Sequence, residues 1–129
     1  MRSPALVAVA VALAGCNGGT VDRHALTNDA STLDSIACEG ALLAHDVSKG
    51  ASTKSFARVH SDALRAQASH LADALSDRPT SPGLEPEVRK KARDASAIAS
   101  VLSLLHHHPS DRERAARAER ALQRAGSCP

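Results

Sequence analysis

The chain is almost devoid of aromatic side chains. Its 129 residues include no Trp, no Tyr, a single Phe and a single Met. Because β-sandwiches draw heavily on aromatic and β-branched residues, this composition disfavours an all-β fold. Hydrophobic residues make up 43% of the chain, but many of them are Ala, and Ala, Leu, Arg, Glu and Gln favour helix. The sequence therefore predicts one small all-α domain.

The sequence also lacks the motifs of several enzyme and cofactor classes. It contains no Gly-x-Ser-x-Gly elbow, no Glu followed three residues later by His, and no Cys-x-x-Cys-His, which argues against those hydrolases, di-iron bundles and attached haem. A formal net charge of +2 is too small to indicate a nucleic-acid partner. We therefore expect a non-enzymatic protein with no nucleic-acid partner and no inferred small-molecule substrate. An enzyme that uses none of these motifs is an alternative.

The longest apolar run is too short to be a stable membrane span. Residues 5–14 are apolar and follow the basic start Met1-Arg2. As a helix this run would extend about 15 Å, half the thickness of a bilayer core. A short apolar run after a basic N-terminus is typical of an export signal.

The end of this run has a specific pattern, Leu13-Ala14-Gly15-Cys16. It resembles the lipobox of bacterial lipoproteins. That resemblance implies cleavage before Cys16, attachment of diacylglycerol to its thiol, fatty acids such as palmitate as the anchor, and a location outside the cytoplasm on a membrane. Asn17, in place of the Asp that marks inner-membrane retention in Gram-negative lipoproteins, favours the outer membrane where there is one. The alternative is an ordinary secreted protein with a chance Cys.

The chain is expected to have three parts. Residues 1–15 form the signal peptide, residues 16–29 the lipidated Cys and a flexible tether, and residues 30–129 a helical domain. The tether prediction rests on the glycines and polar residues of segment 17–28, which shows little periodicity. Twelve extended residues reach roughly 40 Å, enough to hold the domain clear of the lipid headgroups.

Apolar residues at three- and four-residue spacing predict four helices, at about residues 31–48, 52–76, 85–108 and 110–125. Gly40 would permit close approach of a neighbouring helix, and Gly50 and Gly126 would cap helix ends. Ser110 opens a capping box with Glu113. Short connections predict an antiparallel up-down-up-down four-helix bundle. The side of the second helix expected to be buried carries Phe56, Val59, Ala63, Leu64, Ala66, Leu71, Ala74 and Leu75.

Two cysteines remain once Cys16 carries lipid. Cys38 lies two turns into the first predicted helix and Cys128 follows the fourth. An antiparallel bundle places these positions at the same end, and an exported compartment is oxidising, so the sequence predicts a Cys38–Cys128 disulfide. Two free or metal-binding thiols are the alternative.

Histidines gather at the other end of the predicted bundle. His45, His60 and the run His106, His107 and His108 all lie near helix ends that would point away from the membrane. Together with Asp46 they are a candidate surface site for zinc, copper or nickel. The alternative is a set of solvated side chains, since three consecutive helical residues point about 100° apart.

The fourth predicted helix is rich in Arg, at positions 112, 114, 117, 120 and 124. Such a face can contact anionic lipid, cell-wall polymer or an acidic protein. Interspersed Asp111, Glu113 and Glu119 favour a solvated, salt-bridged surface instead. The function that we expect is that of a membrane-anchored interaction or structural module of the cell envelope with a protein partner there. The alternative is an envelope metal-binding protein.

Overall fold

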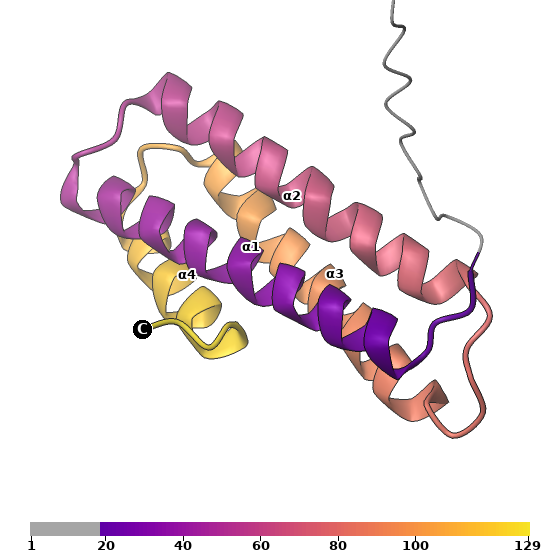
Figure 1. Cartoon of the computed structure of the whole chain (residues 1–129). Helices are drawn as coiled ribbons and strands as arrows, with labels where there is room; N and C mark the ends of the chain where they lie inside the picture. Colours follow the sequence, from indigo (N-terminus) through magenta and orange to yellow (C-terminus); the bar gives the residue numbers. More distant parts are fainter. Residues whose placement is uncertain (1–18) are drawn as a thin grey trace, which may run out of the picture.

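Four helices make up the part of the chain that the computed structural model describes, residues 19–129 (Figure 1). They are α1 (Arg23–Lys49), α2 (Lys54–Asp77), α3 (Glu85–His107) and α4 (Arg112–Ala125). Successive helices run in opposite directions and are joined by short connections. The predicted antiparallel bundle is therefore confirmed, with α1 packing most extensively on α4 and α2 on α3. None of these four helices is both long and apolar enough to cross a membrane.

The first helix begins well before residue 31, where the sequence predicted it. Its N-cap is Asp22, whose side chain accepts a hydrogen bond from the backbone N–H of Ala25 (2.8 Å). Val21, directly before the cap, is fully buried. The prediction of a flexible tether up to residue 29 is therefore wrong from Val21 onward, because one capping side chain and one buried valine fix this polar segment. Residues 16–18 of the predicted tether lie outside the described residues.

The helix ends follow the sequence signals in part. Gly50 ends α1 in the left-handed conformation, with φ 71°, as predicted. The N-cap of α4 is Asp111, which accepts from the N–H of Arg114 (3.0 Å), and not Ser110 of the predicted capping box. Gly126 follows α4 with φ −104°, so it is not a left-handed cap. The reason for a glycine there is close packing against α1.

The main core lies between the four helices and consists of Ala, Leu, Ile and Val side chains. Gly40 sits within it on α1. A Cβ atom at this position would lie 2.8 Å from Cδ2 of Leu102 on α3 and 3.1 Å from Cδ1 of Leu122 on α4. Both leucines are fully buried, so they have little room to move. Gly40 therefore allows the close approach that the sequence predicted.

The buried face predicted for α2 is correct only in part. Leu64 and Leu75 are buried as predicted, but the other buried residues of the helix are Ala57, Ser61, Ala68 and Ala72. Phe56 and Val59 remain 57% and 71% exposed, and Ala63 and Ala66 are exposed too. Ser61 is the polar residue of this buried face, and its hydroxyl donates a hydrogen bond to the carbonyl of Ala57 within the same helix (2.6 Å). Small side chains allow α2 to pack closely on α3. The prediction followed the large apolar residues, and these lie partly on the adjacent, exposed side of the helix.

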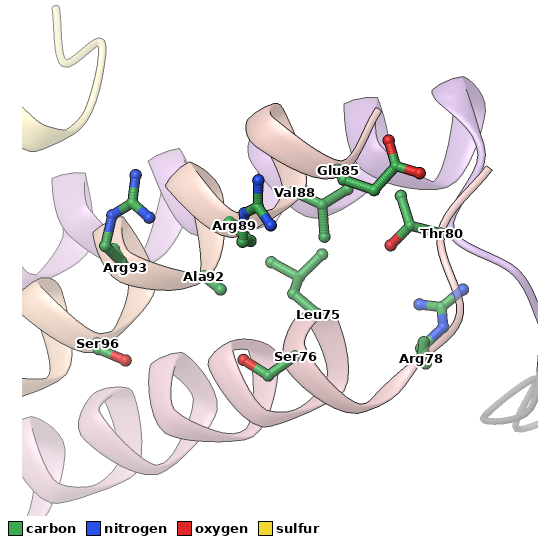
Figure 2. Close-up of a pocket in the computed structure, with 10 residues that line it drawn as sticks. All are labelled: Leu75, Ser76, Arg78, Thr80, Glu85, Val88, Arg89, Ala92, Arg93 and Ser96. Carbon is green, nitrogen blue, oxygen red and sulfur yellow. The ribbon is translucent and has the colours of Figure 1, made fainter. Parts of the chain in front are cut away.

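A second apolar cluster closes one end of the bundle, which we call the proximal end. It contains Val21, Leu26, Leu75, Leu84 and Val88, and Figure 2 shows Leu75 of α2 facing Val88 of α3.

Backbone hydrogen bonds hold Val21 in this cluster. Its N–H donates to the carbonyl of Pro79 (2.8 Å), and its carbonyl accepts from the N–H of Ser81 (3.0 Å). The Arg78 side chain adds a bond from Nε to the carbonyl of Gly19 (3.0 Å). The segment before α1 is therefore tied to the connection between α2 and α3.

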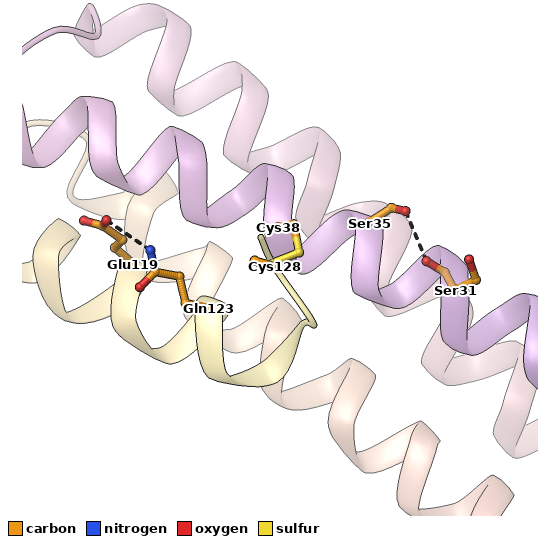
Figure 3. The surroundings of a disulfide bond; sticks show 6 residues. All are labelled: Ser31, Ser35, Cys38, Glu119, Gln123 and Cys128. Carbon is orange, nitrogen blue, oxygen red and sulfur yellow. Dashed lines mark hydrogen bonds between the residues drawn. A yellow bond between two sulfur atoms is a disulfide. The ribbon is translucent and has the colours of Figure 1, made fainter.

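Cys38 of α1 and Cys128, beyond the end of α4, form the predicted disulfide (Figure 3). Their Cα atoms are 5.3 Å apart, a usual separation for a bridged pair. The chain leading to Cys128 passes over α1 at Gly126. A Cβ atom there would lie 3.0 Å from the Ala37 Cβ, the Asp34 carbonyl oxygen and the Cys38 Sγ. Glycine at this position lets the C-terminal segment approach α1 closely enough to form the bridge.

We predict that Gly40→Val destabilises the domain. Helix propensity changes little on balance, but the added carbons meet Leu102 and Leu122, and overpacking of a filled core costs about 1–3 kcal/mol. Chemical denaturation followed by circular dichroism measures the loss. Ala66→Val is the control, because it adds carbons at an exposed position of α2 and is expected to cost only the lower helix propensity of Val, at most about 0.7 kcal/mol. Equal stability of the two variants would contradict the close packing at Gly40.

We also predict that loss of the disulfide lowers stability strongly. The bridge joins residues 90 apart in sequence, and the chain-entropy model gives an upper value of about 4.5 kcal/mol for such a loop. The double variant C38S/C128S should therefore unfold at a markedly lower temperature than the wild type. Reductant should lower the unfolding temperature of the wild type and leave the double variant unchanged. A wild type that is alkylated on both thiols without reductant would show that the bridge is absent.

Candidate functional site

The predicted histidine cluster lies at the end of the bundle opposite to Val21, which we call the distal end. This end holds the α1–α2 and α3–α4 connections (Figure 1). His45 lies in the last turns of α1, His60 in the second turn of α2, and the histidine run at the end of α3. The bundle thus brings these residues to the same level along its axis, as expected.

The histidines nevertheless have separate partners. His45 Nδ1 lies 3.1 Å from Glu119 Oε1 on α4. His60 Nε2 lies 2.9 Å from Glu39 Oε1 on α1. The first pair therefore bridges α1 to α4 and the second bridges α1 to α2.

The run at the end of α3 is dispersed as well. His106 Nδ1 donates to the backbone carbonyl of Arg58 (3.0 Å), while α3 stays helical through His107. Consecutive helical residues point in different directions, so His106, His107 and His108 cannot share one ion.

The structure therefore does not bring His45, His60, His106, His107 and His108 together, and the predicted zinc, copper or nickel site has no support in their geometry. Within residues 19–129, no three His, Cys, Asp or Glu side chains lie close enough together to hold a metal ion. The physical reason is that the histidines lie at the same height along the bundle axis, but their side chains point in different directions around their helices.

Large apolar side chains are exposed in the same half of the bundle. Leu42 of α1 is 64% exposed, and Phe56 and Val59 of α2 are 57% and 71% exposed. The Phe56 ring stacks on His60, with centroids 5.3 Å apart. We call Leu42, Phe56 and Val59 the distal apolar surface.

The contact between Glu39 and His60 links the two sides of this surface. Residues three apart lie on the same side of a helix, so Leu42 is next to Glu39 on α1. Phe56, stacked on His60, lies on the α2 side of the same contact. Leu42 and Phe56 therefore lie beside one point where α1 meets α2, and Val59 lies one turn from Phe56 on α2.

The charges nearest to this surface include a closed ion pair. The Arg65 guanidinium donates to Asp62 Oδ1 from Nε (3.0 Å) and Nη2 (2.7 Å). These hydrogen bonds lower the pKa of Asp62 below its ordinary value. The pair contributes no net charge beside Val59.

A cavity of about 540 Å³ lies at the proximal end between α2 and α3 (Figure 2). Leu75, Val88 and Ala92 provide its apolar lining, and Arg89 and Arg93, one turn apart on α3, border it. Both arginines are exposed. Among residues 19–129, no carboxylate lies within 4.0 Å of either guanidinium.

The other charged groups of this cavity are engaged elsewhere. Glu85 Oε2 accepts a hydrogen bond from the N–H of Gly83 (2.9 Å). Arg78 bonds to the carbonyl of Gly19 and faces Asp29 at 3.7 Å. Nearby, Glu87 pairs with Arg23 (2.6 Å) across α3 and α1, and this hydrogen bond lowers the pKa of Glu87.

The arginine-rich face of α4 is partly neutralised within the helix. Arg114 pairs with Asp111 at 3.0 Å and Arg117 with Glu113 at 2.7 Å. The backbone N–H of Arg114 also lowers the pKa of Asp111 by donating to its carboxylate. These contacts are those of a salt-bridged, solvated surface.

Cys16, the predicted lipidation site, lies outside the described residues. The described chain begins three residues later, at Gly19. Comparison with protein-family models, with curated proteins and with solved structures finds no match to this chain.

Proposed function

We propose that this protein is a lipid-anchored, non-enzymatic interaction module of the bacterial cell envelope. The observation that carries the proposal is the distal apolar surface. The chain contains one Phe, and that Phe is exposed on the bundle instead of stabilising a core composed mainly of Ala and Leu. Neighbouring exposed apolar side chains are typical of interaction sites, and aromatic residues commonly contribute most to binding at such sites.

The lipobox resemblance supports a membrane anchor at Cys16. Five residue steps separate Cys16 from Val21, and an extended chain of that length spans at most about 18 Å. Diacylglycerol on Cys16 would therefore hold the proximal end within about 18 Å of the lipid surface. This distance is less than half of the roughly 40 Å that the sequence alone suggested.

The same geometry leaves the distal apolar surface available to a protein. The 27 residues of α1 extend about 40 Å along the bundle, and Leu42 lies in the half of α1 that is farther from Val21. A partner in the envelope, rather than the anchoring membrane, is therefore the occupant that we propose for this surface. Asn17 in place of an Asp favours the outer membrane as the site of anchoring where a second membrane exists.

The anchor is tested by labelling cells with palmitate. Wild-type protein should take up the label and fractionate with membranes, whereas C16S should remain unlabelled at the mass of the unprocessed precursor. C38S/C128S is the matched control, because it removes two cysteines and should keep the label. Wild-type protein that is released without fatty acid would show that this is an ordinary secreted protein.

The interaction surface is tested by photo-crosslinking of the full chain in its native envelope. A photoreactive residue at Val59 should give an adduct of higher mass, because Val59 belongs to the distal apolar surface. The same residue at Gln123, exposed on α4, should not give that adduct.

The adduct from position 59 should disappear when Leu42→Ser and Phe56→Ser are added. Both side chains are exposed, so these changes are expected to alter stability by less than about 0.5 kcal/mol, which thermal unfolding checks. Equal yields from positions 59 and 123, or no adduct, would contradict the proposal. An adduct of twice the protein's own mass would assign the surface to self-association and overturn the proposal of a different envelope partner.

A further inference from the structure

We infer that a groove between α3 and α4 binds an amphipathic helix of an acidic protein, in which Asp and Glu flank an apolar stripe. Two hollows, of about 310 and 230 Å³, lie between these helices. Val101 of α3 and Ala121 of α4 line both hollows, so the two are continuous. We call them together the α3–α4 groove. Its lining on α3, from Lys90 to Leu104, extends about 21 Å along the helix.

The apolar side chains of this groove are accessible to a partner. Leu104 is 48% exposed, Ala97 and Ala125 are exposed, and Val101 and Ala121 are partly exposed. On α3 these residues follow each other at spacings of four and three, and on α4 the two alanines are four apart. Such spacing places apolar side chains along one seam of each helix. The groove thus offers two neighbouring apolar seams, between which a further helix can pack.

The backbone around the groove favours a helix over an extended peptide. Both walls of the groove are α-helices, in which backbone N–H and C=O groups bond to one another. An extended peptide would find no row of free backbone groups to pair with, unlike at the edge of a sheet. A helix satisfies its own backbone hydrogen bonds and needs only side-chain contacts with the groove.

The charges that line the groove select an acidic partner. They comprise four cations and one carboxylate, namely Lys90, Arg114, Arg117, Arg124 and Asp94. Lys90 pairs with Asp94 (2.8 Å), and Arg114 and Arg117 pair with carboxylates of α4 and its N-cap. Among residues 19–129, no carboxylate lies within 4.0 Å of the Arg124 guanidinium. Carboxylates of a partner helix therefore find positive charge along the groove.

The wider charge distribution agrees with this choice. Residues 85–125, which include α3 and α4, contain nine Lys and Arg against six Asp and Glu, whereas residues 19–84 contain six against eight. Because α2 and α4 do not contact each other, the α3–α4 side lies opposite to the α1–α2 side. An acidic partner is thus attracted to the α3–α4 side and not to the opposite one. The groove is a second surface, separate from the distal apolar surface, and the inference rests neither on that surface nor on the anchor.

The inference is tested with a fragment of residues 19–129 and a designed peptide. The fragment contains the four helices, both apolar clusters and the disulfide, so it has everything needed to fold alone, which circular dichroism checks. The probe is a fluorescent peptide of about 15 residues, long enough as a helix to span the groove, with Leu in one stripe and Glu on both sides of it. Fluorescence anisotropy measures its affinity for the fragment.

Two control peptides establish which property of the probe is recognised. A peptide with Lys in place of each Glu should bind about tenfold more weakly or less, because its charges meet the cations of the groove. A peptide with the same composition in scrambled order should also bind weakly, because it lacks the apolar stripe. Amide NMR signals of Ala97, Val101 and Ala121 should shift when the Glu peptide binds, and those of Phe56 and Val59 should not.

Reversal of the charges along the groove tests the site itself. R117E/R124E should lose about tenfold in affinity for the Glu peptide and gain about as much for the Lys peptide, because each change turns an attraction into a repulsion. R58E/R89E is the matched control, since it makes the same change of charge at exposed arginines of α2 and of the α2 side of α3. It should leave both affinities nearly unchanged. Equal effects of the two double variants would show a non-specific charge effect and overturn the site.

The apolar contact is tested with two leucine variants. Leu104→Ser should weaken binding of the Glu peptide about tenfold, because it removes exposed apolar area from the groove. Leu42→Ser changes a more exposed leucine on the distal apolar surface and should bind like the wild type. The same pair separates this inference from the proposed function, since Leu104→Ser should leave the adduct from position 59 unchanged.

Three outcomes would overturn the acidic helix as the occupant. Absence of binding by the Glu peptide would do so and leave the proposed function intact. Equal binding of the scrambled peptide, together with competition by phosphatidylglycerol vesicles, would assign the groove to an anionic membrane surface. Dimers of the fragment in analytical ultracentrifugation that disappear in R117E/R124E would assign it to a second copy of this chain.

Discussion

Close approach between helices is the constraint on which this structure depends. At Gly40 a single methyl group would collide with two buried leucines, and α2 meets its neighbours through Ala and Ser as much as through Leu. Small side chains bury little apolar area each, so their stabilisation comes from backbones held near one another. The disulfide holds the end of α4 against α1 where Gly126 touches Ala37 and Cys38. It thus limits the separation of the two helices that form one of the two most extensive contacts.

The same constraint explains which helical faces the sequence could predict. On α1 the large apolar residues and the small ones share one stripe, since Leu33, Ile36 and Val47 are buried on the same helix face as small residues. On α2 the two kinds of residue lie on different sides. Periodicity indicated Phe56 and Val59 as buried, whereas the helix buries Ala57, Ser61 and Ala68. The early start of α1 was missed because Val21 is fixed by Pro79 and Ser81, which are distant in sequence.

The candidate sites show how far topology alone can lead. An antiparallel bundle fixes the level of each residue along its axis, and this level was enough to predict the Cys38–Cys128 pair, because Cys128 lies beyond the end of α4. A metal site needs direction as well as level. His45 and His60 lie at similar levels, yet their partners Glu119 and Glu39 belong to α4 and α1. The direction of a side chain depends on which face of its helix packs against the neighbouring helices. For α2, the sequence had already predicted that face incorrectly in part.

The two ends of the bundle are built differently, and the difference bears on function. At the proximal end, backbone bonds to Val21 and the Arg78 bond to Gly19 join the segment before α1 to the α2–α3 connection. A force applied to that segment would therefore be distributed over α1, α2 and α3, and would not act on the first turn of α1 alone. The distal apolar surface instead lies on α1 and α2, where the largest apolar side chain of the chain is only partly covered, by stacking on His60. Burying Phe56 in the core would have required α2 to turn away the small residues that let it approach α3. Its exposure is consistent with the close packing, and binding of a protein partner would bury it without disturbing that packing.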